Sequence, residues 1–328
     1  MKLAHVALLS LLAAAGCLDP SEAGNLVPKT VEEDPALPAI EINGARLHAE
    51  TYGKADAPVI MVLHGGPGGD YRGLLPLAAL ADDGYQVVFW DQRGAGLSQR
   101  FDASELSTDQ YLEDLRLVVD HYTAAGQPLV FIGHSWGAMY ATWFIDTYGD
   151  YGGKIRGAVL SEPGAFTWDQ LEAYFKRLNA SIEIFGEQLG DIAWAEQFMS
   201  PSDHARADYL YSLRQVGGLP ADHKDPNNPR PFWRSGAIAS AELQAIVKRD
   251  GFDWTRNLAA FQRDVVFIRG DLNTAATLEA QQELAASYPH AELVTIQGVG
   301  HQMIWERPTE YLADVRAYLA KISFGGAR

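Results

Sequence analysis

The sequence predicts an α/β protein: a mostly parallel central sheet flanked by helices, with a mainly helical cap inserted into it. Short, continuous apolar runs such as residues 58–63 and 86–90 recur between helical stretches, which is typical of buried parallel strands. Glycine-rich loops follow several of these runs. Between residues 165 and 261 the alternation of strands and helices stops, and aromatic residues and helix formers replace it. We therefore expect a main domain over residues 39–164 and 262–328, and a helical cap over residues 165–261.

The N-terminal residues stand apart from this fold. Residues 3–15 are apolar, too few to span a bilayer but suited to the core of a signal peptide. The small residues before Cys17, the one cysteine of the chain, resemble the lipobox of bacterial lipoproteins, in which the cysteine is acylated. We expect residues 1–16 to be a lipoprotein signal peptide and Cys17 to be its lipidation site. Plain cleavage by the general signal peptidase is the alternative.

Residues 17–38 contain four prolines and an acidic run without apolar periodicity, which predicts a tether between the lipid anchor and the folded chain. Leu18 follows the cysteine, and this resembles the outer-membrane sorting pattern of Gram-negative lipoproteins. We expect an exported protein anchored at the bacterial outer membrane, or otherwise a periplasmic or secreted one.

Composition and charge exclude several kinds of partner. Of the 328 residues, 47% are hydrophobic and 21% are charged, as in ordinary globular proteins, and no internal apolar stretch is long enough to cross a membrane. The formal net charge of −16 would repel phosphate backbones and anionic lipid surfaces. We expect no nucleic-acid partner, and contact with a membrane only through the N-terminal lipid anchor.

The individual elements can be placed in order along the chain. Residues 39–43 and 47–52 predict a hairpin that turns at Asn43 and Gly44. Apolar runs predict further strands at 58–63, 86–90, 127–133, 155–160, 264–268 and 291–296. Helical spacing predicts helices at 106–124, 139–148, 168–178, 182–198, 202–216, 237–248 and 278–287, and a final amphipathic helix that ends near residue 322.

Residues 133–137 read Gly-His-Ser-Trp-Gly and lie between a predicted strand and a predicted helix. In a nucleophile elbow, the serine occupies a strained turn of this kind and its hydroxyl is exposed at the start of the helix. The two glycines keep the neighbouring backbone from colliding. An ordinary glycine-serine turn is the alternative, but the flanking strand and helix favour Ser135 as a nucleophile.

A second glycine-rich loop, residues 64–70, directly follows the predicted strand at 58–63. Because glycines let backbone N–H groups approach a ligand closely, such a loop can supply part of an oxyanion hole. We predict the N–H groups of Gly66 and Trp136 as the two donors. A Gly-Pro-Gly turn that binds nothing is the alternative.

Three motifs together resemble the proline iminopeptidase branch of the α/β-hydrolases: residues 64–69, 91–98 and 133–137, in this order and at these intervals. The resemblance covers residues 40–165 and 262–325, and it implies an α/β-hydrolase fold in which these segments form the catalytic domain. That branch usually has a second glycine where this chain has His134. Because related esterases and lactone hydrolases carry the same motifs, the resemblance leaves the substrate class open. In the iminopeptidases, cap carboxylates hold the free amino group of the substrate, and Glu183, Glu187 and Glu196 are available here.

The loop Gly-Val-Gly-His at residues 298–301 follows the last predicted strand and resembles the catalytic histidine loop of this fold. His301 is therefore predicted to be the general base, and a surface histidine is the alternative. The usual acid position after the penultimate strand holds Asn273, which cannot supply a negative charge. Asp271 is nearby, while Glu162 follows the strand at 155–160 as the acid does in some haloalkane dehalogenases. We favour Glu162 as the acid, with Asp271 as the alternative.

These residues predict a serine hydrolase that forms an acyl-enzyme on amide or ester bonds. A proline iminopeptidase-like aminopeptidase acting on small peptides is the first interpretation, and a carboxylesterase or lactonase is the alternative. A non-catalytic, surface-anchored binding lipoprotein is a third. Dehalogenase and epoxide hydrolase activities are disfavoured because those enzymes have aspartate where this chain has Ser135. We expect neither a metal site nor a cofactor, since this chemistry requires none.

Overall fold

The computed structural model describes residues 27–178, 204–217, 225 and 227–324. The centre of the molecule is an eight-stranded sheet with the order β1-β2-β4-β3-β5-β6-β7-β8. The strands are β1 Ala39–Ile42, β2 Ala45–Tyr52, β3 Val59–Leu63, β4 Gln86–Trp90, β5 Leu129–His134, β6 Ile155–Ser161, β7 Val265–Gly270 and β8 Ala291–Ile296. All pairs from β4 to β8 are parallel, which confirms the predicted fold class.

The first two strands form the predicted hairpin and are the antiparallel part of the sheet. Asn43 and Gly44 both have positive φ, 50° and 70°, as a two-residue hairpin turn requires. β2 then pairs antiparallel with β4. Every residue of β3, β4, β5 and β7 is buried, which explains their continuous apolar sequences: both faces of these strands are covered.

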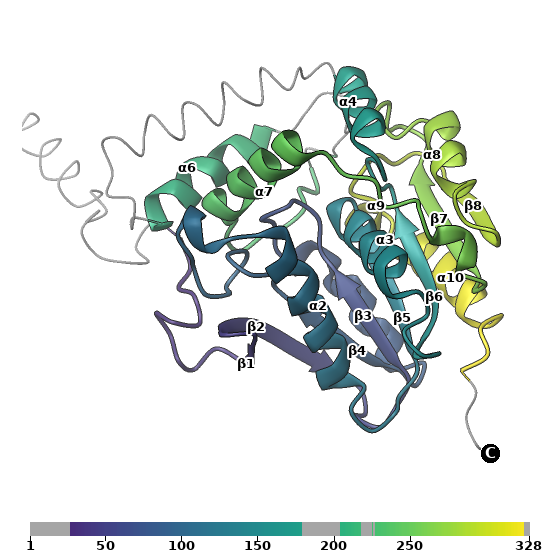
Figure 1. The fold of residues 1–328 in the computed structure, drawn as a ribbon, viewed down its shortest axis with the longest axis horizontal. Helices are drawn as coiled ribbons and strands as arrows, with labels where there is room; N and C mark the ends of the chain where they lie inside the picture. The colour runs from purple at the N-terminus through teal and green to yellow at the C-terminus, as the bar shows by residue number, and fades with distance from the viewer. Residues whose placement is uncertain (1–26, 179–203, 218–224, 226, 325–328) are drawn as a thin grey trace, which may run out of the picture.

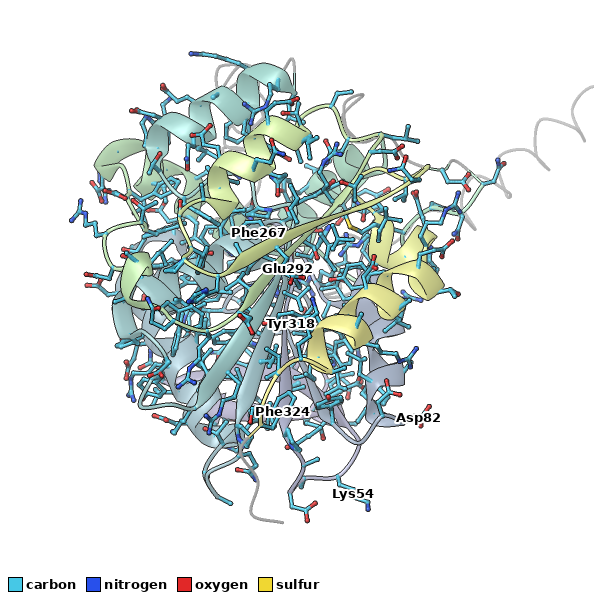
Figure 2. The ribbon with its side chains drawn as sticks, turned by 90° about the vertical axis from the view of Figure 1, so that its right-hand side faces the viewer. Lys54, Asp82, Phe267, Glu292, Tyr318 and Phe324 are labelled. Atoms are coloured by element: carbon cyan, nitrogen blue, oxygen red, sulfur yellow. The ribbon has the colours of Figure 1, made fainter. Side chains whose placement is uncertain are left out.

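Two layers of helices cover the two faces of the sheet (Figures 1 and 2). Alternate residues of one strand enter different cores: Met61 packs in the core that contains α2, α3 and α8, while Ile60 packs in the core that contains η1 and α10. Figure 2 shows α10, with Tyr318, beside β8 at the edge of the sheet. The bounds of these helices are η1 Arg72–Ala81, α2 Thr108–Tyr122, α3 Trp136–Tyr148, α8 Leu278–Ala285, α9 Met303–Glu306 and α10 Pro308–Leu319. The short helices η2 Ala103–Glu105 and η4 Leu258–Ala260 lie in connections.

Between β6 and β7 the structure describes three longer helices: α4 Trp168–Arg177, α6 His204–Gly217 and α7 Ala237–Asp250. They lie at the end of the sheet towards which the parallel strands point (Figure 1), the end where ligands bind in open α/β sheets. The helix predicted at 182–198, with Glu183, Glu187 and Glu196, lies outside the described residues. None of the described helices is long and apolar enough to cross a membrane.

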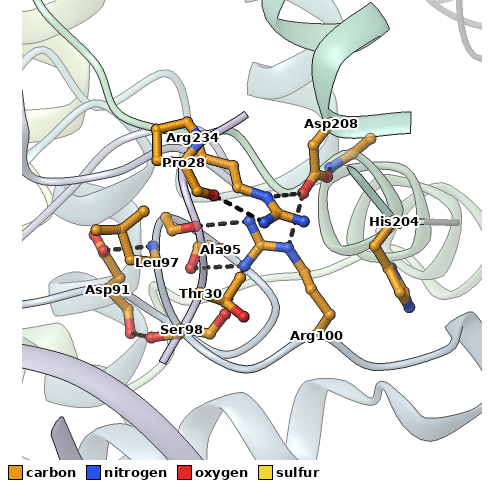
Figure 3. Close-up of polar contacts among 12 residues, drawn as sticks. Pro28, Thr30, Asp91, Ala95, Leu97, Ser98, Arg100, His204, Asp208 and Arg234 are labelled. Atoms are coloured by element: carbon orange, nitrogen blue, oxygen red, sulfur yellow. Dashed lines mark hydrogen bonds and ion pairs between the residues drawn. The ribbon is translucent and has the colours of Figure 1, made fainter. Parts of the chain in front are cut away.

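A buried ion-pair cluster joins α6 to the rest of the chain (Figure 3). Asp208 of α6 accepts hydrogen bonds from Arg100 at 2.9 Å and from Arg234 at 2.7 Å. Arg234 also donates to the carbonyl oxygen of Pro28 and to the carboxylate of Glu33. Because a buried charge that loses its partner is costly, the cluster fixes α6 against the loop after β4 and against the N-terminal segment.

Residues 27–38 therefore differ from a free tether. Val31 is fully buried, and its N–H donates to the carbonyl oxygen of Leu97 at 2.8 Å. Val27 is also buried, and Glu33 is paired with Arg234 as described. This short stretch therefore has partners both in the loop after β4 and, through Arg234, in the segment before α7, which its sequence alone could not reveal. The predicted signal peptide, Cys17 and residues 18–26 lie outside the described residues.

Candidate active site

Ser135 lies in a sharp turn between the end of β5 and the start of α3. Its φ and ψ are 57° and −121°, a backbone conformation that is strained for any residue with a side chain. The two flanking glycines make this turn possible. A Cβ atom on Gly133 would lie 2.5 Å from the carbonyl oxygen of Gly137, and one on Gly137 would collide with the carbonyl group of Leu63. The elbow thus depends on glycine at both positions.

Trp136 and Gly66 lie next to this serine and both line the same pocket. Trp136 is the first residue of α3, and the N–H groups of a first helical turn have no acceptor within the helix. Gly66 has φ 135°, and a Cβ there would lie 2.6 Å from the amide nitrogens of Gly68 and Gly69. A Cβ on Gly65 would lie 3.1 Å from Cβ of Ser135. The glycine loop and the elbow therefore approach each other as closely as backbone allows.

Gln92 joins the glycine loop to the start of α3. Its side-chain N–H donates to the carbonyl oxygen of His64 at 3.1 Å, and its Oε1 accepts from the indole N–H of Trp136 at 2.9 Å. Its backbone N–H donates to Nε2 of His64 at 3.0 Å. The motif at residues 91–98 thus positions the glycine loop and the start of α3 relative to each other.

His301 and Glu162 form a buried pair. Nδ1 of His301 lies 2.5 Å from Oε2 of Glu162, and the glutamate side chain is fully buried. Glu162 directly follows β6 and has φ 45°, so it shares with Ser135 the strained backbone that gathers at functional sites. Its other carboxylate oxygen accepts the N–H of Gly270 at 2.8 Å. Because Nδ1 of His301 donates to a carboxylate, the proton of Ser135 would go to Nε2.

Asn273 and Asp271 both lie after β7, and the structure gives them different surroundings. The side-chain N–H of Asn273 donates to Oε2 of Glu162 at 2.6 Å. Asp271 instead accepts the backbone N–H groups of Gly298 and Val299, at 2.6 and 3.3 Å. Asn273, in the usual acid position, therefore contacts the carboxylate of Glu162. Asp271 instead stabilises the loop that leads to His301.

His134 also contacts the loop that carries His301. Its Nε2 lies 2.7 Å from the carbonyl oxygen of His301, and because a carbonyl can only accept, this nitrogen carries the proton. The two imidazole rings lie 4.5 Å apart. Burial, followed by the charges of His301 and Arg230, lowers the pKa of His134 well below its ordinary value. His134 is therefore neutral in the folded protein and holds the backbone of His301 in place.

This neutral histidine makes stability depend on pH. Below about pH 6.5 the unfolded chain binds a proton at His134 that the folded chain does not, so the free energy of unfolding falls as the pH falls. We expect His134→Asn, which retains an N–H donor, to reduce the loss of stability between pH 7 and 5.5 by about 1 kcal/mol. Urea unfolding at both pH values measures this. The exposed His290 is the control position, and an unchanged pH dependence in His134→Asn would contradict the assignment.

One pocket contains Ser135, His301, Gly66 and Trp136 in its lining. The rest of the lining comes mainly from α4, α7 and the segment after α7, and it is strongly apolar. It includes Met139, Leu171, Phe175, Leu243, Phe252 and Trp254. Gln244 of α7 adds an amide, and no acidic side chain is among the described residues that line the pocket.

The structure thus brings together Ser135, His301, Glu162, Gly66 and Trp136, and it places Asp271 against another loop. Sequence reasoning gave no role to His134, Asn273 or Gln92. For Asn273 the sequence did carry a signal. An amide at the usual acid position cannot act as the acid, but it can donate a hydrogen bond to a carboxylate that lies elsewhere. His134 had stood out only as a departure from the resembled branch, and Gln92 only as part of the motif at residues 91–98, and neither pattern indicated the contacts that they make.

Comparison with known proteins identifies the relatives of this chain. A family model described as "Alpha/beta hydrolase family" matches residues 59–315. The chain is 23% identical over 280 residues to the "Proline iminopeptidase" of Saccharolobus solfataricus, covering 80% of this chain and 85% of that protein. It is 28% identical over 318 residues to "Epoxide hydrolase A" of Mycobacterium tuberculosis, covering 85% and 96%. A solved thermophilic esterase from Thermogutta terrifontis superposes with a TM-score of 0.63 at 20% identity, covering 87% of this chain and 98% of that chain.

Proposed function

The chain belongs to the alpha/beta hydrolase family and is a hydrolytic enzyme, and we propose that it is a serine hydrolase that cleaves esters of uncharged acids. The observation that supports this most is the shared pocket of Ser135 and His301, with the carboxylate of Glu162 at 2.5 Å from Nδ1 of the histidine. A serine hydroxyl is a weak nucleophile until a positioned base accepts its proton. The three residues supply a nucleophile, a base and an orienting acid.

The proposed reaction is acyl transfer in two steps. His301 takes the proton of Ser135 while the serine oxygen attacks the substrate carbonyl, and Glu162 stabilises the imidazolium that forms. The oxyanion accepts hydrogen bonds from the N–H groups of Gly66 and Trp136, aided by the dipole of α3. His301 then protonates the departing alcohol. Water, deprotonated by the same histidine, cleaves the acyl-enzyme and restores Ser135.

The pocket lining favours an uncharged acyl group. An aminopeptidase must hold the ammonium group of its substrate beside the scissile bond, and burying that charge without a partner is unfavourable by several kcal/mol. The described lining offers aromatic and aliphatic side chains and one amide, Gln244, but no carboxylate. An apolar acyl group needs no charged partner, so we place esters first.

A proline-releasing aminopeptidase is the second candidate. It is supported by relatives named proline iminopeptidase, among them the one from Saccharolobus solfataricus. Glu183, Glu187 and Glu196 lie outside the described residues and could supply a carboxylate for the amino group of a peptide. An epoxide hydrolase activity is not proposed, because Ser135 occupies the position where those enzymes use aspartate.

A parallel assay separates the two candidates. We expect the purified protein to hydrolyse p-nitrophenyl esters of short acids with a kcat/KM at least tenfold above that for proline β-naphthylamide, because only the amide substrate carries an ammonium group. Ser135→Ala is the control for background hydrolysis. A kcat/KM that is higher for the proline amide would reverse the order of the two candidates.

A further inference from the structure

The glycine loop between β3 and η1, residues 64–71, is held from two sides. On the side of the main domain, Gln92 bonds His64, and the N–H of Tyr71 donates to the carboxylate of Asp91 at 3.2 Å. On the other side lies the segment that leads into α7, residues 230–236. This loop contains Gly66, a proposed oxyanion donor, so whatever fixes the loop also fixes that donor.

Asp70 makes most of the hydrogen bonds between the loop and that segment. Its Oδ2 accepts the backbone N–H groups of Trp233 at 2.6 Å and of Arg234 at 3.1 Å. Its Oδ1 accepts the N–H of Arg72 at 2.9 Å. The guanidinium of Arg230 donates to its carbonyl oxygen at 3.0 Å. The side chain is 1% exposed, so these donors replace water entirely.

The two backbones also touch directly beside Asp70. The N–H of Gly236 donates to the carbonyl oxygen of Gly68 at 2.7 Å. A Cβ on Gly68 would lie 2.5 Å from the carbonyl oxygen of Gly236 and 2.8 Å from Cβ of Ser240 in the first turn of α7. A shift of residues 230–236 would therefore be transmitted to the glycine loop within two residues of Gly66.

The side chain of Asp70 is buried, and burial disfavours the charged form of a carboxyl group. Burial, together with the nearby charge of Asp91, raises the pKa of Asp70 to about 6, although Arg230 and the hydrogen bonds from the backbone act in the opposite direction. His48 also lies close enough to interact with the charge of Asp70. Because the folded chain binds a proton more readily than the unfolded one, ionisation of Asp70 at neutral pH reduces stability. Perturbed pKa values gather at functional sites, and Asp70 lies in the same loop as the proposed oxyanion donor Gly66.

We propose that Asp70 is a positioning residue, whose carboxylate holds the glycine loop against residues 230–236 so that the N–H of Gly66 points at the developing oxyanion. The inference rests on the proposed serine hydrolase function. It adds residues 230–236, the segment before α7, to the parts of the chain that position the two oxyanion donors. The contribution is made in the transition state, because the oxyanion exists only there.

The test compares Asp70→Asn with Asp146→Asn. The amide of asparagine has only one oxygen, so at least one of the three backbone N–H groups loses its acceptor. Asp146 is a matched control, since it is a buried aspartate that accepts the backbone N–H of Asn257 at 2.6 Å and is remote from the glycine loop. On a p-nitrophenyl ester we expect Asp70→Asn to lower kcat about tenfold or more, with KM changed less than twofold. The Asp146→Asn variant keeps the wild-type kcat.

A structural role alone predicts a different result: a lower unfolding midpoint and an unchanged kcat for Asp70→Asn, which would overturn the inference. Asp70→Ser, which leaves a hydroxyl acceptor and no charge, takes its place if the asparagine variant does not fold. The outcomes also separate the two proposals. If the wild-type protein hydrolyses the ester and the Asp70 variant has the same kcat, only this inference is overturned. If the wild-type protein does not hydrolyse the ester, the proposed function is overturned and this inference with it.

Discussion

Replacement of Glu162 by glutamine is expected to lower kcat about 10³- to 10⁴-fold, as the equivalent loss of a triad carboxylate does in serine proteases. The amide can still reach Nδ1 of His301, but it carries no charge to stabilise the imidazolium. Its N–H can also face the N–H of the histidine, and two donors cannot form a hydrogen bond. Asn273 and Gly270, which donate to this side chain, would each face a weaker acceptor.

Asp271→Asn is the matched variant, because it makes the same chemical change on the other candidate carboxylate. An amide oxygen can still accept the N–H groups of Gly298 and Val299, so we expect less than a tenfold loss of kcat. Steady-state kinetics on one ester, with unfolding midpoints for both variants, measures the difference. A large loss in Asp271→Asn beside a small one in Glu162→Gln would assign the acid to Asp271.

Replacement of Ser135 by alanine has the largest expected effect, a loss of about 10⁶ in kcat, since it removes the nucleophile while the rest of the site remains. Ser161 provides the control on the neighbouring strand. Its hydroxyl bonds the hydroxyl of Tyr311 at 2.7 Å and does not line the pocket, so Ser161→Ala should keep turnover within about twofold. Turnover that survives in Ser135→Ala would show that another group attacks the substrate.

Much of the fold follows from local sequence. Apolar runs predicted β3 to β8. In β3, β4, β5 and β7 these runs are continuous because the sheet is covered on both faces there, which buries every residue of the strand. The turn at Asn43 and Gly44 was predictable because the positive φ angles required there suit these residues. The elbow at Ser135 was predictable for a related reason, since its two glycines are needed by local backbone geometry.

The polar contacts of the site were harder to predict because they join distant parts of the chain. Glu162 and Asn273 are 111 residues apart, and His134 and the carbonyl of His301 are 167 apart. They meet because β5, β6, β7 and β8 are adjacent in the sheet and end at the same edge. The sequence favoured Glu162 over Asp271 by resemblance alone, and the structure adds the contacts: the side chain of Glu162 meets His301, while Asp271 accepts the N–H of Gly298.

The central claim is that Ser135 is a nucleophile activated by His301. Incubation of the folded protein with a fluorophosphonate probe, followed by mass spectrometry of its peptides, tests this claim directly. We predict one covalent adduct, on Ser135, that forms in wild-type protein, is lost in Ser135→Ala and forms far more slowly in Glu162→Gln. A folded wild-type protein that takes up no probe, or takes it up on another residue, would contradict the claim and favour a binding protein that keeps the hydrolase fold.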